Sequence, residues 1–189
     1  FTTERAAREL SWRLPGAETR LDALDFGIPQ SIGEFAVTAF PTSHDAPGSC
    51  GFRLDAAGGA VGVLTDTGYV TDEAADILEG VDLAVLEANH DIETLRSGPY
   101  PYYLKQRILG AQGHLSNEDA ARFAAVLAQS GTSEIILAHL SRENNTPAMA
   151  QTAVERALSA AGVSPLLSVA PRDCLGPAHT VSRRSVCRR

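Results

Sequence analysis

The segments VDLAVLEANH, residues 81–90, and EIILAHLS, residues 134–141, decide the fold predicted for this 189-residue chain. Each starts as a short apolar run rich in branched side chains, as buried β-strands do, and each ends in polar residues that include a carboxylate or an imidazole. Helical patterns with capping residues follow at 116–130 and 146–161. Strands that alternate with helices predict an α/β layered domain.

The same patterns extend toward both ends of the chain. Residues 34–40 (EFAVTAF) alternate and predict a strand, and residues 51–54 and 60–65 predict a hairpin. A short helix is expected over 71–78 and a last strand over 166–169. The polar stretch 88–115 is interpreted as one long loop, and loops of that length in compact domains are often functional.

Three possible metal ligands directly follow predicted strands, in the order His44, Asp66 and His139. Imidazole nitrogens and carboxylate oxygens bind divalent ions such as Zn²⁺ and Mn²⁺, and a carboxylate can bridge two of them. Asp66, between the two histidines, suits the bridging role. In two-metal hydrolytic sites the ions lie roughly 3.5–4 Å apart and ionise water near neutral pH. The pattern therefore suggests half of a dinuclear site.

Each of these residues also has an ordinary structural explanation. His44 suits a hydrogen-bonded turn, and Asp66 in TDTG suits an Asx-turn. His139 suits a core histidine bonded to a carbonyl, and Glu87 suits a carboxylate that accepts from a backbone amide. The metal-site interpretation depends on the order and context of the residues taken together.

Composition limits the class of protein. The sequence is 44% apolar and 21% charged, which is typical of one globular domain, and no apolar run is long enough to span a bilayer. Three cysteines without C-x-x-C spacing argue against a disulfide framework and a thiolate zinc site. A reducing cytoplasm is the expected location, with no membrane partner.

Charge is distributed unevenly. The net charge is −7, but residues 171–189 carry five arginines and one aspartate, so that the remainder, 1–170, is strongly acidic. We predict a folded domain over 1–170 and a basic, disordered tail over 171–189. An acidic domain disfavours polyanions at long range, so nucleic-acid binding would need a local basic patch.

Four segments in order resemble the metallo-β-lactamase-fold hydrolases, in particular the YycJ/WalJ-type branch. They are LEANHD (86–91), YPYYLKQRI (100–108), GHLSN (113–117) and AHLSRENN (138–145). The resemblance extends over about residues 1–169. It implies a four-layer αβ/βα sandwich and metal-dependent nuclease activity, in particular 5′-to-3′ exonuclease action on double-stranded DNA.

The resemblance also implies roles for single residues. His44, Asp66 and His139 correspond to ligands of two divalent ions, Zn or Mn, with Asp66 as the bridge. The related tRNA 3′-end-processing nucleases use a Glu and a His at positions like those of Glu87 and His114 to assist the leaving oxygen. A histidine oriented by a carboxylate is a suitable general acid, so we predict that Glu87 and His114 form the catalytic pair.

Candidate substrate contacts lie between and just after these residues. Tyr100, with the neighbouring tyrosines of YPYYLKQR, can stack on a base, and Lys105 and Arg107 can hold phosphate. Arg142, three residues after His139, is a further phosphate candidate. Aromatic residues next to proline are as often plain loop packing.

The H-x-H-x-D-H motif diagnostic of the family is not in the printed sequence. We interpret the chain as the C-terminal part of a longer protein, an N-terminally incomplete domain lacking its first strands. A metallo-hydrolase acting on a small ester, thioester or lactone is a second interpretation, because one fold serves many chemistries. A non-catalytic binding module with part of the fold is a third.

Overall fold

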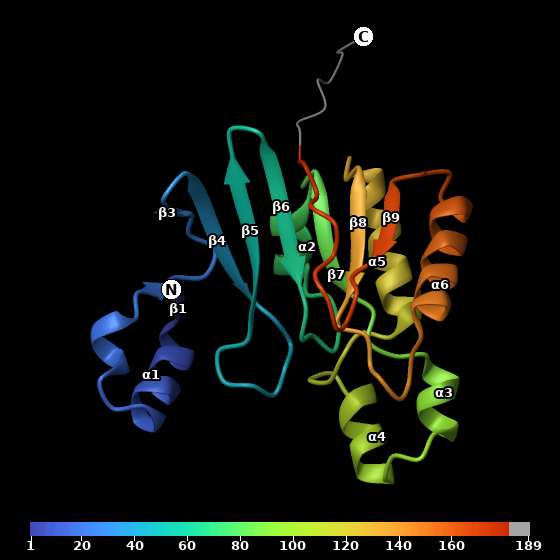
Figure 1. The fold of residues 1–189 in the computed structure, drawn as a ribbon, viewed down its shortest axis with the longest axis horizontal. Coiled ribbons are helices and arrows are strands. Elements are labelled where there is room, and N and C mark those ends of the chain that lie inside the picture. Colours follow the sequence, from blue (N-terminus) through green and yellow to red (C-terminus); the bar gives the residue numbers. More distant parts are fainter. Residues whose placement is uncertain (182–189) are drawn as a thin grey trace.

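The large sheet of the protein has seven strands in the order β3-β4-β5-β6-β7-β8-β9 (Figure 1). The computed structural model describes residues 1–181. The first three of these strands pair antiparallel, as do β5 and β6, and the strands from β6 to β9 are parallel. Their bounds are β3 (Gln30–Ile32), β4 (Phe35–Pro41), β5 (Cys50–Ala56), β6 (Gly59–Leu64), β7 (Leu83–Glu87), β8 (Glu134–Ala138) and β9 (Leu166–Val169).

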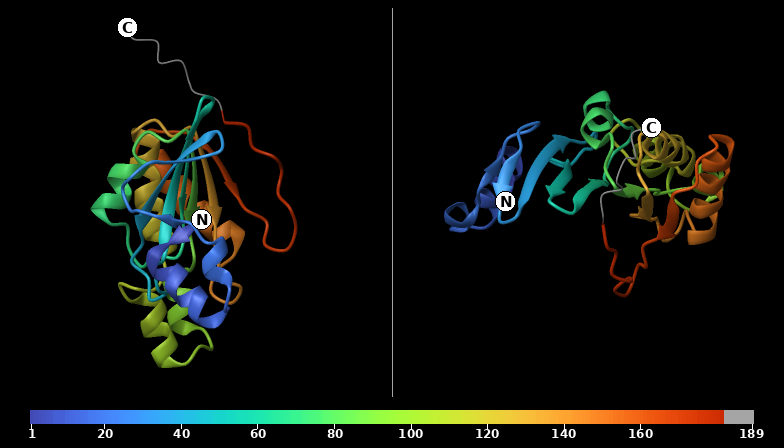
Figure 2. Two further views of the ribbon diagram at one scale, coloured as in Figure 1. Left: turned by 90° about the vertical axis from the view of Figure 1, so that its left-hand side faces the viewer. Right: turned by 90° about the horizontal axis from the view of Figure 1, so that it is seen from above.

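Three helices cover one face of this sheet, and they are α2 (Asp72–Leu78), α5 (Asn117–Gln129) and α6 (Pro147–Ala160). Their apolar side chains and those of the strands form one buried cluster, to which Phe40, Leu86, Phe123 and Ile135 belong. The segment that follows β9 passes over the opposite face (Figure 2). The helices bury one face of the parallel strands, whereas several side chains of these strands, such as Val61, Val63 and Val85, are only partly buried.

The N-terminal residues lie beside strand β4, to which Phe26 forms a single β-bridge at Ala39. The two-residue strands β1 (Thr2–Thr3) and β2 (Ala23–Leu24) pair in parallel, with α1 (Glu4–Arg13) and the 3₁₀ helix η1 (Ala17–Arg20) between them. Thr3 caps α1 by accepting a hydrogen bond from the amide of Ala6. These residues fall within the predicted domain over 1–170, but no individual helix or strand was predicted before residue 34.

The predicted α/β class is confirmed, and the strands and the three sheet-covering helices lie within two residues of their expected bounds at most termini. The predicted loop over 88–115 is wrong, because the stretch contains the helices α3 (Ile92–Ser97) and α4 (Tyr102–Leu109). Asp91 caps α3 by accepting from the amide of Thr94 at 2.8 Å. Both helices lie beyond the carboxyl ends of the parallel strands (Figure 1) and are too short to show a clear apolar period.

The C-terminal part of the chain is extended. Residues 171–181 form neither helix nor strand. Arg172 donates to the carbonyl of Ser141 at 3.0 Å, and His179 contacts Glu134 at 2.5 Å. The rest of the predicted tail, 182–189, lies outside the described residues. No helix within 1–181 is long and apolar enough to cross a membrane.

Candidate metal centre

Four polar side chains meet at one edge of the large sheet because of strand direction. β4, β6, β7 and β8 all point the same way, so their carboxyl ends lie together. His44 follows β4, Asp66 follows β6, Glu87 ends β7 and His139 follows β8. Ligand sites in open α/β sheets form at this edge, because residues distant in sequence converge there.

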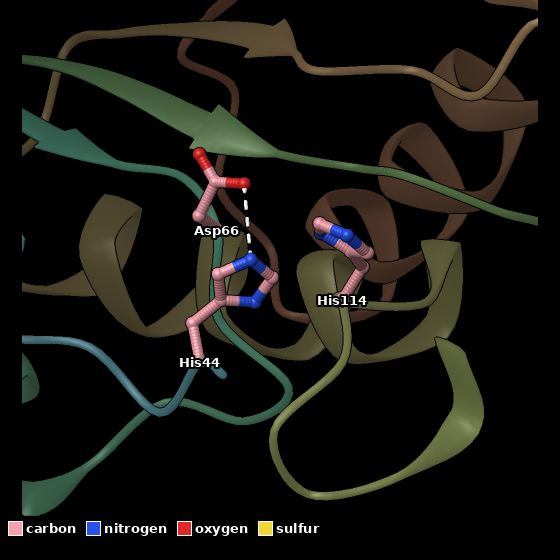
Figure 3. A group of neighbouring side chains, drawn as sticks. All are labelled: His44, Asp66 and His114. Atoms are coloured by element: carbon pink, nitrogen blue, oxygen red, sulfur yellow. Dashed lines mark ion pairs between the residues drawn. The ribbon is translucent and has the colours of Figure 1, made fainter. Parts of the chain in front are cut away.

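Asp66 lies between the two predicted histidine ligands. Its Oδ1 is 3.6 Å from Nε2 of His44 and 3.7 Å from Nε2 of His139. His114, which comes from the segment before α5, also faces this position (Figure 3). Its ring centroid is 4.8 Å from that of His44 and 5.2 Å from that of His139. Ligand atoms of His44, Asp66 and His114 all lie within 4.8 Å of one another.

Glu87 is fully buried beneath these rings. Its Oε1 accepts hydrogen bonds from Nδ1 of His114 at 2.7 Å and from Nδ1 of His139 at 2.8 Å. Its Oε2 accepts from the amides of Thr67 and Leu115. Burial alone would raise the pKa of Glu87, but the hydrogen bonds from the two imidazoles outweigh it and lower the pKa. Glu87 is therefore ionised and orients both rings.

His44 is oriented in the same way by a carbonyl. Its Nδ1 lies 3.0 Å from the oxygen of Gly113. Carbonyls and carboxylates only accept hydrogen bonds, so Nδ1 carries the hydrogen in His44, His114 and His139, and in a neutral ring Nε2 keeps its lone pair. A metal-ligating histidine is commonly fixed by an acceptor on its other nitrogen. The hydrogen bond with Glu87 raises the pKa of His139, so its ring must lose a proton to bind a cation.

The backbone at the two strand ends adopts an uncommon conformation. Asp66 has φ 56° and His139 has φ 59°, and they are the two residues other than glycine with positive φ in the described chain. Such left-handed positions are unfavourable for residues with a Cβ and often occur at functional sites. The side-chain amide of Asn89 donates to the carbonyl of His139 at 2.8 Å, which helps hold this turn.

Asparagines that the sequence analysis did not single out hold the loops together. The side chains of Asn117 and Asn145 bond to each other in both directions, at 2.8 and 3.0 Å, and Asn145 also donates to the carbonyl of Ala88 at 2.8 Å. Both are buried. They tie the start of α5 to the loops after β7 and β8. Asn117 and Asn145 each end a segment that resembles the family, GHLSN and AHLSRENN respectively. Their presence in these segments was the signal that could have identified them.

The four predicted substrate contacts occupy different surroundings. Lys105 of α4 donates to the carbonyl of Arg96 at 2.7 Å. Arg107 forms a two-pronged ion pair with Asp45, next to His44, and this hydrogen bond lowers the pKa of Asp45. Arg142 instead pairs with Asp173 in the C-terminal segment. Tyr100 is half-buried between α3 and α4.

A family model described as the beta-lactamase superfamily domain matches residues 2–140 of this chain, which includes every ligand candidate described above. The chain belongs to this family. The structure of the metallo-β-lactamase-fold protein YhfI from Bacillus subtilis superimposes with a TM-score of 0.60 at 21% identity, over 79% of this chain and 52% of that protein. The predicted metallo-β-lactamase fold is therefore confirmed.

Two curated relatives place the chain more closely within this fold. It is 42% identical over 137 residues to exodeoxyribonuclease WalJ of Streptococcus pneumoniae, and 38% identical over 136 residues to exodeoxyribonuclease YycJ of Bacillus anthracis. Each alignment covers 72% of this chain, and 51% and 52% of the respective relative. The predicted resemblance to the YycJ/WalJ-type branch is confirmed, and the chain spans about half the length of these relatives.

The residues at the sheet edge fit the divalent metal ions that a metallo-β-lactamase fold implies. The donors are imidazole nitrogens fixed by acceptors on their far side and an aspartate shared between two of them. This set of oxygen and nitrogen donors suits zinc, manganese and similar ions. His44, Asp66 and His139 are the side chains that would hold them, and His114 lies beside this group.

Proposed function

We propose that this protein is a metal-dependent phosphodiester hydrolase that degrades double-stranded DNA from the 5′ end, with two divalent ions, zinc or manganese, as cofactors. The observation that carries the proposal is Asp66, whose carboxylate lies 3.6 and 3.7 Å from the free Nε2 atoms of two anchored histidines. The similarity to two exodeoxyribonucleases supports the choice of DNA.

His44, Asp66 and His139 are the proposed metal ligands, with Asp66 shared between the two ions. When bound, divalent ions supply a water that is ionised near neutral pH and stabilise negative charge on the phosphate. The anchored Nδ1 atoms of His44 and His139 keep both Nε2 atoms directed at Asp66 before any ion binds. The protein therefore provides a preformed site.

His114 is the proposed general acid. Its Nδ1 donates to buried Glu87, which fixes the orientation of the ring, and Nε2 carries the proton that the leaving oxygen of the DNA receives. Glu87 acts through His114 and is a positioning residue. The same carboxylate holds His139, so one buried group couples the acid to the metal ligand.

Lys105, Arg107, Arg142 and Tyr100 are the proposed DNA contacts. Arg107 supports this role because it is exposed and its partner Asp45 lies directly after His44, so that the guanidinium is held near the metal centre. The sequence as a whole is acidic, at a net charge of −7. DNA binding that depends on a few local cations should weaken steeply with salt.

The proposal is tested by adding Mn²⁺ to the protein with end-labelled double-stranded DNA, using Asp66→Asn as the inactive control. We expect stepwise shortening from the 5′ end, competition by unlabelled DNA and loss of activity in the variant. Hydrolysis of thioester or lactone substrates without action on DNA would contradict the nuclease and support a small-ester hydrolase. Metal and DNA binding without hydrolysis would support a binding module.

We also propose that the protein works in a reducing compartment such as the cytoplasm. The support is the state of its cysteines, because Cys50 and Cys174 are free thiols in the described part of the chain. Cys187 lies outside the described residues. Mass spectrometry of protein alkylated immediately after cell lysis would show three modified cysteines if this is correct.

A further inference from the structure

A cavity of about 570 Å³ lies beside the metal centre, between α4 and the start of α5. Gly68 and His114 line it on the side of the metal site, and Ile92 and Leu109 contribute apolar wall. Its volume is within the range of small-molecule sites, roughly 300–1,000 Å³. His114 lines the cavity and also faces the metal centre. In the proposed function, a ligand in the cavity would therefore lie directly next to the reacting phosphate.

His90, at the wall of this cavity, has two ring nitrogens without a hydrogen-bond partner in the described residues. The side chain is 1% exposed. Burial lowers the pKa of His90 to about 4, so the ring is neutral and offers one donor and one acceptor. Buried polar groups are nearly always paired, so a group that enters the cavity with a complementary donor or acceptor would satisfy His90.

The outer wall combines a cation with an exposed aromatic ring. Tyr102 is 77% exposed, and Lys105 lies three residues later on α4, so the two project from the same side of the helix. Lys105 uses one hydrogen on the carbonyl of Arg96 and keeps others for a ligand. The carboxylate of Asp119 also lines the cavity but is already engaged by Ser116 and Arg122.

We infer that this cavity holds the terminal nucleotide of the DNA strand, with the base against Tyr102, the 5′-phosphate on Lys105, and a polar edge bonded to His90. The inference rests on the proposed function and names a subsite of it. Base stacking on an aromatic ring next to a cation is the usual chemistry of sequence-tolerant strand binding. The nucleotide in the cavity would receive the proton of His114 on its 3′-oxygen when the P–O bond breaks.

Lys105 is the only lysine in the sequence, and this makes a direct test possible. We would acetylate the protein in Mn²⁺ buffer and follow Lys105 by peptide mass spectrometry with deoxyadenosine 5′-monophosphate, deoxyadenosine or inorganic phosphate present. The nucleotide should slow acetylation of Lys105 several-fold, and phosphate alone at equal concentration should not. Equal protection by phosphate alone would overturn a nucleotide site in favour of an anion site.

Two adjacent tyrosines supply matched variants. Tyr102 and Tyr103 are both strongly exposed on α4, at 77% and 74%, but Tyr102 alone of the pair lines the cavity. Tyr102→Ala should weaken nucleotide protection of Lys105 by about 5-fold or more, the effect of losing one stacked base, whereas Tyr103→Ala should preserve it. Equal effects of both variants would contradict the inference.

The labelling experiment tests the nucleotide site and the nuclease assay tests the proposed function, so the two proposals can be overturned independently. A protein that degrades DNA but shows no protection by the nucleotide would overturn the cavity as a nucleotide site and leave the proposed function standing. A protein that shows protection but degrades no DNA would overturn the nuclease and retain the nucleotide site.

Discussion

Glu87 and His139 share a buried hydrogen bond of 2.8 Å between Oε1 and Nδ1, and the same oxygen accepts from His114 at 2.7 Å. One carboxylate therefore fixes a proposed metal ligand and the proposed general acid. The other oxygen accepts from two backbone amides, so all the contacts of Glu87 require an acceptor. This arrangement makes Glu87 the structural centre of the site.

Glu87→Gln should lower metal affinity about 10–100-fold, the usual cost of disturbing a group that orients a ligand. An amide has one acceptor atom and one donor atom, so its NH₂ must face either the two imidazole N–H groups or the two backbone N–H groups. Chelator competition with Mn²⁺ or Zn²⁺ measures the change. Glu93→Gln on exposed α3 is the control, and equal affinities in the two variants would exclude this role of Glu87.

Gly113→Ala should weaken metal binding through His44. An added Cβ would lie 2.1 Å from the carbonyl oxygen of Ile108, so the backbone must shift, and Gly113 supplies the carbonyl that orients His44. Gly58→Ala is the matched control because its nearest neighbour would be 3.6 Å away. The same chelator titration compares them, and unaltered affinity in Gly113→Ala would show that the carbonyl is dispensable.

His90→Leu should remove part of the acid sensitivity of the fold. The pKa of His90 is lowered from 6.5 to about 4, chiefly by burial, so between these pH values the unfolded chain binds more protons and stability falls as pH decreases. The parent protein should lose roughly 3 kcal/mol more than the variant between pH 7 and pH 4. Urea unfolding at pH 7 and pH 4 measures the loss of stability in each protein. Equal losses in the parent protein and the variant would mean that His90 has a similar pKa in the folded and unfolded states.

Asn145→Ala should destabilise the fold by about 2–4 kcal/mol, because it leaves the carbonyl of Ala88 and the side chain of Asn117 unpaired in a buried place. Denaturant unfolding gives the value. Glu143→Ala, at an exposed position two residues earlier, should stay within about 0.5 kcal/mol. A similar small effect at Asn145 would show that water replaces the lost partners.

The ends of the strands were predicted well from the sequence, because an apolar run followed by a polar turn identifies both the strand and the polar residue that comes after it. His44, Asp66 and His139 were found in this way, and parallel strand direction explains why they meet. The pairing of Glu87 with His114 was expected from the family resemblance, but the second hydrogen bond of Glu87, from His139, was not, since pairing across β7 and β8 depends on register and ring orientation.

Two other features were missed for different physical reasons. The short helices α3 and α4 have no long apolar stripe, because they lie beyond the sheet and pack little of their surface. The burial of His90 and its lack of partners depend on the neighbouring loops, which sequence periodicity does not describe. Capping residues such as Asp91 were the available signal for α3.

Anomalous X-ray scattering from crystals of the protein grown with Mn²⁺ locates the bound ions without reference to activity, and so decides whether they bind at Asp66. We predict manganese peaks in contact with Nε2 of His44, Nε2 of His139 and the carboxylate of Asp66, and their loss in Asp66→Asn. Manganese bound elsewhere, with these three side chains bonded only to protein groups, would contradict it.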